Sequence, residues 1–199
     1  MPRRVVKLGG SLLSRPDVWT RLERWLAREP AATVLVVGGG TVVEAIRDLD
    51  RVHGLDPVEA HWWCIEIMAR QAQLAHRRLT GSRLVEQLHE LAEINTPPSL
   101  AIFNPFPLLR EDDALRNDRL PASWDVTSDS IAARIASRSR ADELVLLKST
   151  LPTTDTVDSL AASGFVDAYF PVVARELAAV RVVDLADDAF TERHIVIRS

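Results

Sequence analysis

The stretch RVVKLGG, residues 4–10, followed by Ser11, carries the strongest structural information in this chain. Its apolar and β-branched positions predict a short buried strand that delivers Lys7 to a turn. At that turn Gly9 and Gly10 let the backbone approach a ligand without a Cβ in the way. Backbone N–H groups at such a turn, with a helix start beyond it, form a cradle for an anion, and Lys7 adds a positive charge. The stretch therefore predicts a phosphate site, although a pair of glycines is also found at simple strand-ending turns.

The same order of strand, glycine turn and helix occurs a second time. Residues 32–37, ATVLVV, predict a buried strand that ends in Gly38, Gly39 and Gly40, before a helix that begins at Thr41. Buried apolar strands that alternate with amphipathic helices favour an α/β fold, with a parallel sheet and helices on both faces. Both glycine turns would then lie at the carboxyl ends of strands, where open α/β sheets bind ligands.

The rest of the chain continues this alternation. Apolar residues at helical spacing predict helices, and short apolar runs predict strands. The expected helices cover residues 16–28, 41–49, 57–79, 84–94, 131–138, 159–163 and 172–177, and the remaining expected strands cover 100–103, 143–147, 180–185 and 194–197. Residues 104–107, NPFP, should interrupt regular structure, and residues 110–123 should form a loop beside the site.

Two later residues could join the glycine turns in a phosphoryl-transfer site. Such a site needs cations and N–H donors around the transferring group, because its work is mostly positioning and charge stabilisation. Lys148 follows a predicted strand, and Asp129 lies in the hydroxyl-rich start, residues 127–130, of a predicted helix. Asp129 could orient lysines by ion pairing, hold a metal, or simply cap the helix. Ser11 could likewise donate to a phosphate or serve only as a helix cap.

Several aromatic residues have a less specific meaning. Trp62 and Trp63 lie near the start of the predicted helix at 57–79. Core or dimer packing is favoured for them over the wall of a flat-ligand pocket, because large aromatics dominate burial in cores and interfaces. This helix is therefore a candidate surface for a homo-oligomer, a dimer. Together with Trp124, the paired tryptophans weakly favour a flat ring as the ligand.

Composition excludes several classes of protein. The 199 residues are 47% apolar and 26% charged, which suits one ordinary globular domain with a full core. A net charge of −4 without a long basic run gives no footprint for nucleic acid. Because no apolar stretch has the length of a signal peptide or a membrane span, we expect a cytoplasmic protein with no membrane partner.

Motifs of other catalytic classes are missing from the sequence. It contains neither a nucleophile elbow, an H-E-x-x-H helix, a Walker P-loop nor a G-x-G-x-x-G turn. The single cysteine, Cys64, excludes an intrachain disulfide, and its apolar mid-helix position argues against a nucleophile. The five histidines do not cluster, so no protein-bound metal site is expected.

The order of three motifs resembles the amino acid kinase family, which includes aspartate, glutamate and uridylate kinases. The motifs are VVKLGGSLL from residue 5, VLVVGGGTVVEAIR from residue 34 and TSDSIAARIA from residue 127. Two further stretches, EAHWWCIEIMARQAQLA from residue 59 and PASWDVTSDSIAARIA from residue 121, narrow the match. They resemble the small archaeal-type kinases that phosphorylate an aminomethylfuran methyl phosphate in methanofuran biosynthesis. Bacterial relatives of that branch are associated with one-carbon metabolism.

This resemblance implies a fold and assigns acceptor binding and nucleotide binding to different halves of the chain. The fold would be a three-layer αβα sandwich with a mostly parallel central sheet, in one domain over residues 1–199. An acceptor half would cover roughly residues 1–125, and a shortened nucleotide half roughly residues 126–199. The protein would be an enzyme, a phosphotransferase that uses ATP and Mg²⁺ on a small phosphorylated acceptor and yields a diphosphate.

The resemblance also implies roles for individual residues. Lys7 would stabilise the transferring phosphoryl group, and Asp129 would organise the lysines. Gly9, Gly10 and Ser11 would contact the phosphates of ATP. The second glycine turn, residues 38–40, would line the acceptor side.

One segment departs from the family pattern. Family kinases follow the late strand with a threonine–aspartate turn and a glycine that help to hold the nucleotide. Here the corresponding segment, residues 144–156, reads LVLLKSTLPTTDT, with Lys148 and Ser149 in place of that turn. Either Lys148 and Ser149 meet the nucleotide directly, or the protein is a repurposed member that binds a phosphorylated ligand or a partner subunit without transfer.

Overall fold

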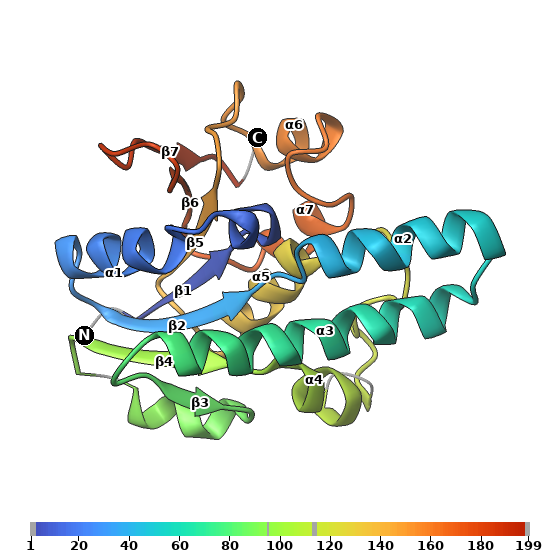
Figure 1. Ribbon diagram of the computed structural model, residues 1–199, viewed down its shortest axis with the longest axis horizontal. Helices are drawn as coiled ribbons and strands as arrows, with labels where there is room; N and C mark the ends of the chain where they lie inside the picture. Colours follow the sequence, from blue (N-terminus) through green and yellow to red (C-terminus); the bar gives the residue numbers. More distant parts are fainter. Residues whose placement is uncertain (1–2, 95, 113–114, 198–199) are drawn as a thin grey trace.

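The computed structural model describes residues 3–94, 96–112 and 115–197, and Figure 1 shows them as a central sheet with helices on both sides. Within these residues seven strands form one sheet in the order β3-β4-β2-β1-β5-β6-β7. Neighbouring strands run parallel, except that β6 and β7 are antiparallel. The strands are β1 (Arg3–Leu8), β2 (Ala32–Val37), β3 (Arg83–Val85), β4 (Ser99–Phe103), β5 (Glu143–Lys148), β6 (Val180–Asp184) and β7 (Glu192–Ile195).

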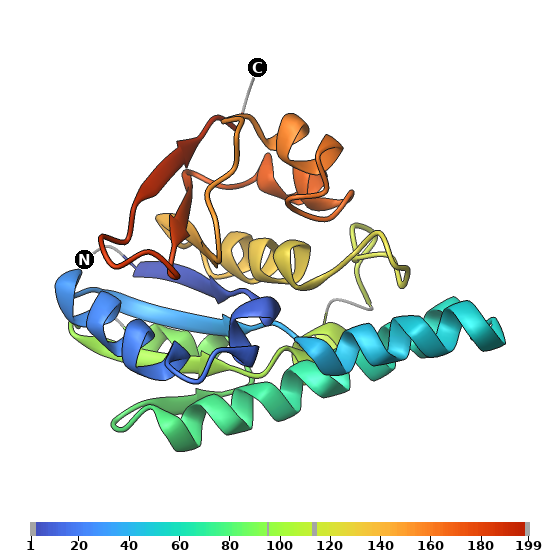
Figure 2. The same cartoon turned by 45° about the horizontal axis from the view of Figure 1, so that its top comes forward.

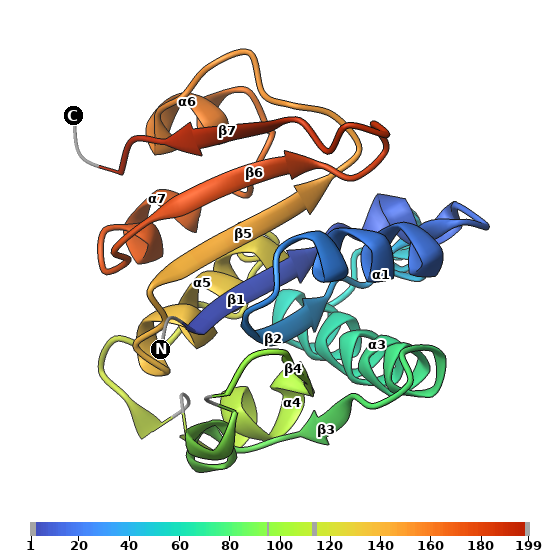
Figure 3. The ribbon, with the colours of Figure 1, turned by 90° about the vertical axis from the view of Figure 1, so that its left-hand side faces the viewer.

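Helices cover both faces of this sheet. Figure 3 shows α1 on one face, and α5 and α7 on the other. The helices of the described residues are α1 (Val18–Arg28), α2 (Thr41–His53), α3 (Pro57–Arg78), α4 (Pro105–Pro107), α5 (Ser128–Arg138), α6 (Val157–Ala162) and α7 (Phe170–Ala174). Two short 3₁₀ helices, η1 (Gly10–Ser14) and η2 (Leu88–Glu93), and a π-helical turn, η3 (Leu108–Asp112), complete the set.

Alternation along the strands divides the core into two parts. Val5 of β1 packs in the cluster that contains the buried faces of α5 and α7, whereas its neighbour Val6 packs with Leu22 and Trp25 of α1. Successive side chains of a strand point to opposite faces, so the all-apolar strands supply both clusters at once. The three-layer α/β sandwich predicted from the sequence is confirmed.

The central position of β1 decides where the site lies. Lys7 of β1 is aligned with Val36 of β2 on one side and with Leu146 of β5 on the other. Because all three strands run parallel, their carboxyl ends lie at one edge of the sheet. The segments that follow Leu8 and Val37, together with Lys148 at the end of β5, are therefore brought together there.

The prediction of one helix over residues 84–94 is wrong. Its first residues form β3, in which Leu84 is aligned with Ile102 of β4 at the sheet edge. A capping box between Gln87 and Glu90 then starts the short η2. The apolar spacing is shared by a helix and by an edge strand followed by a 3₁₀ turn, and pairing with β4 decides between them.

Other boundaries also differ from the expectations. Residues 104–107 do not simply interrupt the structure, because the Asn104 side chain accepts from the Phe106 N–H and caps the one-turn α4. The expected loop at 110–123 begins inside the π-helical turn η3. Asp17 occupies the N-cap of α1, so Pro16 precedes the helix rather than opening it. The two short helices near the C-terminus and β7 each begin two residues earlier than expected.

Helices α2 and α3 form an antiparallel pair that extends beyond the end of the sheet (Figures 1 and 2). Asp56 caps α3 by accepting from the N–H groups of Val58 and Glu59, and Gly54 ends α2 in the left-handed conformation. Helix α2 begins at the carboxyl edge of the sheet, where the candidate site lies, whereas α3 passes this edge and continues alongside β2, β4 and β3 (Figure 1).

Candidate active site

The two glycine turns meet each other at the carboxyl edge of the sheet. A Cβ at Gly10 would lie 2.5 Å from the backbone nitrogen of Gly40, and a Cβ at Gly9 would lie 2.8 Å from the carbonyl oxygen of Leu147. Gly40 also has a φ of +66°, a conformation that glycine adopts without steric cost. Because these glycines have no side chains, the two turns pack directly against each other. This contact sets the spacing between the helices that begin after the turns.

Three helix starts converge on this point. η1 begins at Gly10, α2 at Thr41 and α5 at Ser128, and a Cβ at Gly38 would lie 3.1 Å from the Ser128 hydroxyl oxygen. The N–H groups in the first turn of a helix have no partner within that helix. Their partial positive charge favours an anion in front of them. The convergence is suited to a ligand that carries several negative charges.

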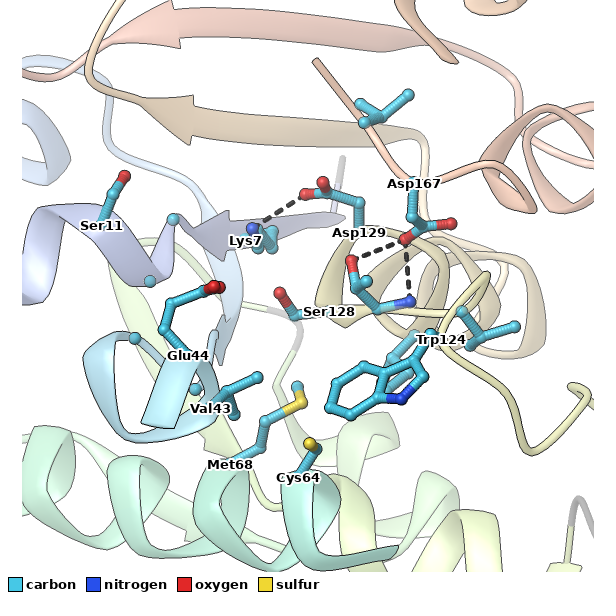
Figure 4. Close-up of a pocket in the computed structure, with 18 of the residues that line it drawn as sticks. Lys7, Ser11, Val43, Glu44, Cys64, Met68, Trp124, Ser128, Asp129 and Asp167 are labelled. Atoms are coloured by element: carbon cyan, nitrogen blue, oxygen red, sulfur yellow. Dashed lines mark hydrogen bonds and ion pairs between the residues drawn. The ribbon is translucent and has the colours of Figure 1, made fainter. Parts of the chain in front are cut away.

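A cavity of about 450 Å³ lies in front of these helix starts. Figure 4 shows its two ends, with Lys7 and Asp129 on one side and Trp124, Cys64 and Met68 on the other. The first end is charged, and the second is aromatic and sulfur-rich. A ligand with a phosphate part and a flat apolar part would match both ends.

At the charged end, Asp129 lies between two lysines. Its Oδ1 is 2.8 Å from Lys7 Nζ, its Oδ2 is 2.8 Å from Lys148 Nζ, and the side chain is 6% exposed. Burial alone would raise the pKa of Asp129, but the two ammonium charges outweigh it and hold the pKa at about 2. Burial lowers the pKa of Lys7, and the attraction of Asp129 opposes that effect. Of the three interpretations of Asp129, ion pairing with lysines is the one that this geometry shows.

Lys148 is also held by a segment further along the chain. Its ammonium group donates to Asp129 and to the carbonyl oxygen of Phe165, at 2.9 Å, and it lies 5.2 Å from the centre of the Phe165 ring. Lys7 and Lys148 are the two lysines of the whole sequence, in which every other strongly basic side chain is arginine. Both ammonium groups of the chain's lysines therefore meet at one carboxylate.

Asp167 is a site residue that the sequence reasoning missed. Its carboxylate accepts hydrogen bonds from the N–H and hydroxyl of Thr127 and from the N–H and hydroxyl of Ser130. Thr127 itself makes no side-chain cap, so the expected hydroxyl cap of α5 is replaced by a carboxylate from another segment. Burial raises the pKa of Asp167, and the nearby Asp129 charge raises it further, against these hydrogen bonds. No sequence motif around Asp167 indicates a site residue, because its hydrogen-bond partners, Ser130 and Thr127, lie 37 and 40 residues earlier in the chain.

The aromatic end of the cavity is built around Trp124. Its indole N–H donates to the Asp50 carboxylate at 2.6 Å, and the Arg47 guanidinium lies 4.9 Å from the ring centre. Burial raises the pKa of the Cys64 thiol to about 11, so it is protonated at neutral pH and is a poor nucleophile, as expected. These contacts fix one flat face of the cavity.

The paired tryptophans are not part of this cavity. Trp62 packs against the core and contacts Phe106 edge-on, and Trp63 is 37% exposed. The wall of the cavity next to them is formed by His61, whose pKa is lowered by burial.

Most of the residues singled out in the sequence line this one cavity: Lys7, Gly9, Gly10, Ser11, Gly39, Gly40, Asp129 and Lys148. Gly38 lies behind the lining, against Gly10. Ser149 is exposed and does not line the cavity. The segment after β5 thus contributes Lys148 to the cavity without Ser149.

The described residues contain no group of three or more histidine, cysteine, aspartate or glutamate side chains placed to hold a metal ion. None of the helices in residues 3–94, 96–112 and 115–197 is long and apolar enough to cross a membrane.

The fold is similar to that of solved nucleotide kinases at low sequence identity. A UMP kinase from Bacillus anthracis superposes with a TM-score of 0.67 at 15% identity, over 94% of this chain and 88% of that one. A UMP kinase from Ureaplasma parvum gives 0.62 at 14% identity, over 91% and 88%. Uridylate kinase from Archaeoglobus fulgidus gives 0.53 at 18% identity, over 78% and 69%. At these identities the likeness establishes the fold alone.

Sequence comparison gives a more specific result. No curated protein matches the chain. The model of the amino acid kinase family matches residues 2–150, which include both glycine turns, Asp129 and Lys148. The segment that carries Phe165 and Asp167 lies beyond the match. The cavity of the chain carries the positive charges that a phosphoryl group needs. Because the family model matches residues 2–150, which are most of the chain, this protein belongs to the amino acid kinase family.

Proposed function

We propose that this protein is an ATP-dependent kinase that transfers the γ-phosphoryl group to a phosphorylated furan-type acceptor, in the biosynthesis of a methanofuran- or methylofuran-type cofactor of one-carbon metabolism. Family membership supports a small-molecule phosphotransferase. The observation that carries the proposal is the placement of both lysine ammonium groups on the two oxygens of Asp129, beside the converging helix starts. This arrangement offers positive charge where a transferring phosphoryl group develops negative charge.

The residues divide the work of transfer between them. Lys7 stabilises the transferring group, and Asp129 keeps both lysines in position. Gly10 and Ser11 offer N–H donors to the phosphates of ATP, and Lys148 approaches the same phosphates. Gly9 lets the turn come close to them without a Cβ, while its own N–H donates to the Leu147 carbonyl oxygen. The second glycine turn, residues 38–40, lies on the acceptor side. An oxygen of the acceptor forms a bond to the γ-phosphorus while the bond to the bridging oxygen breaks, and ADP leaves.

The carboxylates of the cavity support an acceptor whose attacking oxygen is already ionised. Asp129 is paired with two lysines, Asp167 accepts four hydrogen bonds, and Glu44 is paired with Arg47 at 2.8 Å. The two buried carboxylates, Asp129 and Asp167, are therefore not free to accept a proton from an alcohol, whereas Glu44 is held only by a pair at the surface. A phosphate acceptor needs no such base, and a diphosphate is then the product.

The pairing of these carboxylates also affects how the site would bind Mg²⁺. Mg²⁺ takes oxygen ligands and is often bound through substrate phosphates and water, with one or two protein carboxylates. In this cavity it fits as part of the ATP complex, where it neutralises charge on the phosphates. Glu44, which is exposed and paired only with Arg47 at the surface, is the carboxylate of the lining best placed to turn toward it.

The aromatic end supports a flat acceptor. Trp124 presents a ring that Asp50 and Arg47 hold in place, and the sulfur atoms of Met68 and Cys64 lie on the same side of the cavity (Figure 4). Rings and polarisable sulfur atoms contact a flat heterocycle favourably. A furan ring at this end would direct its phosphate toward Lys7.

The test is a transfer assay followed by ³¹P NMR. The purified protein is incubated with ATP, Mg²⁺ and 5-(aminomethyl)-3-furanmethanol phosphate, with Lys7→Met as the control. The proposal predicts a diphosphate product and ADP, neither of which the control forms at a comparable rate. No diphosphate from the wild type, together with no detectable ATP binding, would refute it.

A second candidate rests on the segment after β5. Ser149 is exposed, and the threonine–aspartate–glycine turn of the family is missing. The alternative is a repurposed member that binds a phosphorylated ligand or a partner subunit without transfer. Calorimetric titration with ATP separates the two, because micromolar binding that Lys7→Ala weakens counts against this alternative.

The proposal also includes a homodimer. The outer face of α2 exposes Val42, Leu49 and Val52, and the start of α3 exposes Val58 and Trp63. An extended pair of helices with apolar side chains in water is suited to pack against a second copy. Sedimentation should give a dimer at micromolar concentration, and a monomer would remove this part of the proposal.

Two further parts of the proposal concern organisation. One domain would cover residues 1–199, with an acceptor half at 1–125 and a nucleotide half at 126–199, and it would work in the cytoplasm, where ATP is available. Limited proteolysis that releases a stable fragment, or fractionation that places the protein elsewhere, would contradict these parts.

A further inference from the structure

The start of α5 is held by a residue outside the helix. Thr127 occupies the N-cap, yet its side chain makes no cap hydrogen bond. Asp167 Oδ2 instead accepts from the N–H groups of Thr127 and Ser130, both at 3.0 Å, and from the Thr127 hydroxyl at 2.8 Å. The Ser130 hydroxyl donates to the other oxygen of the carboxylate. One carboxylate thus fixes both ends of the first turn of α5.

Asp129 lies within that turn. It is the second residue of α5, between the two residues that Asp167 holds. Its two oxygens each face a different ammonium group at 2.8 Å, and this requires one particular orientation of the carboxylate. A small rotation of the first turn would move one oxygen away from its lysine, because the side chain has a short reach.

The segment that supplies Asp167 also holds Lys148. The carbonyl oxygen of Phe165, two residues before Asp167, accepts from Lys148 Nζ at 2.9 Å. Gly164, with a φ of +71°, begins this segment in a conformation that glycine favours. Residues 164–167 therefore contact both Lys148 and the turn that carries Asp129, and all four line the cavity.

We propose that Asp167 is a positioning residue of this site, which holds the first turn of α5 so that the Asp129 carboxylate bridges Lys7 and Lys148. The inference rests on the proposed kinase function for its effect on turnover. The contacts to the turn do not depend on that function. Residues 164–167 lie beyond the part of the chain that the family model matches, so the C-terminal segment completes a site whose other residues lie within the match.

The chain itself offers a probe of this geometry. Because Lys7 and Lys148 are its two lysines, protein labelled with ¹³C at lysine Cε gives one NMR signal from each. The signals are assigned with Lys7→Arg and Lys148→Arg. Asp167→Asn keeps the size of the side chain but places an amide where four donors meet. Asp158→Asn, at an exposed position in the first turn of α6, is the matched control.

The expected result has two parts. In Asp167→Asn both lysine signals move from their wild-type positions, and in Asp158→Asn neither moves. In the transfer assay, Asp167→Asn lowers kcat by about tenfold or more, as residues that orient an active group do, with the KM for ATP changed less than about twofold. A purely structural role would reduce the amount of folded enzyme and would leave kcat per folded enzyme unchanged.

Each outcome decides a separate question. Lysine signals that stay at their wild-type positions in Asp167→Asn overturn the inference, whatever the activity. Signals that move while kcat stays unchanged overturn the positioning role in catalysis. If the wild type forms no diphosphate, the proposed function fails, and the NMR comparison alone decides whether Asp167 positions Asp129. If Asp167→Asn does not fold, Ser130→Ala removes one donor, and the same signals should move by a smaller amount; unmoved signals refute the inference.

Discussion

Replacement of Asp129 by asparagine should destabilise the protein far more than replacement of one of its lysine partners. In Asp129→Asn the ammonium groups of Lys7 and Lys148 lose the carboxylate that they share. In Lys148→Met the pair between Lys7 and Asp129 remains. The first change leaves two like charges close together, and the second leaves a matched pair.

The structure sets the size of this difference. The pKa of Asp129 lies at about 2, against an ordinary value of 3.8. At about 1.4 kcal/mol per pKa unit, the lysines stabilise the carboxylate by about 2.5 kcal/mol beyond the cost of its burial. A buried charge that loses its partner costs about 3–5 kcal/mol. We expect Asp129→Asn to lower the free energy of unfolding by about 3–5 kcal/mol, and Lys148→Met to lower it by about 1–2 kcal/mol.

Urea unfolding at pH 7, with linear extrapolation to water, measures both values. Asp158→Asn is an exposed control that should change the free energy of unfolding by less than about 0.5 kcal/mol. A loss in Asp129→Asn no larger than that in Lys148→Met would refute the shared ion pair as the organising contact of the site.

Three further predictions follow from other contacts. Below pH 4 the wild type should lose stability as the pH falls toward 2. The pKa of Asp129 is lower in the folded state than in the unfolded state, so its stabilising effect is present above the unfolded value and is lost as the pH falls through the folded value. Urea unfolding of Asp129→Asn should show no such contribution. Gly10→Ala should abolish transfer and cost about 1–3 kcal/mol, because its Cβ would meet the Gly40 backbone at 2.5 Å. Gly81→Ala, which has open space but a φ of +79° that an alanine rarely adopts, should lose stability and keep wild-type kcat. Trp124→Leu should raise the KM of the furan acceptor with little change in that of ATP, which steady-state kinetics can check; equal changes in both would contradict the assignment of the aromatic end.

The sequence predicted those parts of the fold in which the pattern is local. Residues 32–37 are apolar except for Thr33 and form β2 with the predicted bounds, because a central parallel strand is buried on both faces. Residues 84–94 failed because their apolar spacing fits two structures, and the decision depends on pairing with β4, a contact between distant segments. Burial against a neighbour overrides local preference there.

The candidate site follows the same division. Lys7 and the glycine turns could be found because strand, turn and helix are adjacent in the sequence. Asp167 could not, because its function in the site depends on donors at Thr127 and Ser130 that the fold brings to it. Lys148 was found as a residue that follows a strand, but its second contact, to the Phe165 carbonyl, depends on the course of the chain after α6.

The central claim is that a triphosphate binds at the two lysines that Asp129 holds together. Lysine labelled with ¹³C at Cε reports on both ammonium groups, since the chain has no other lysine. A non-hydrolysable ATP analogue with Mg²⁺ is titrated into the labelled protein. We expect the signals of Lys7 and Lys148 both to move and to saturate together at one equivalent. Two signals that stay in place at saturating analogue would contradict it.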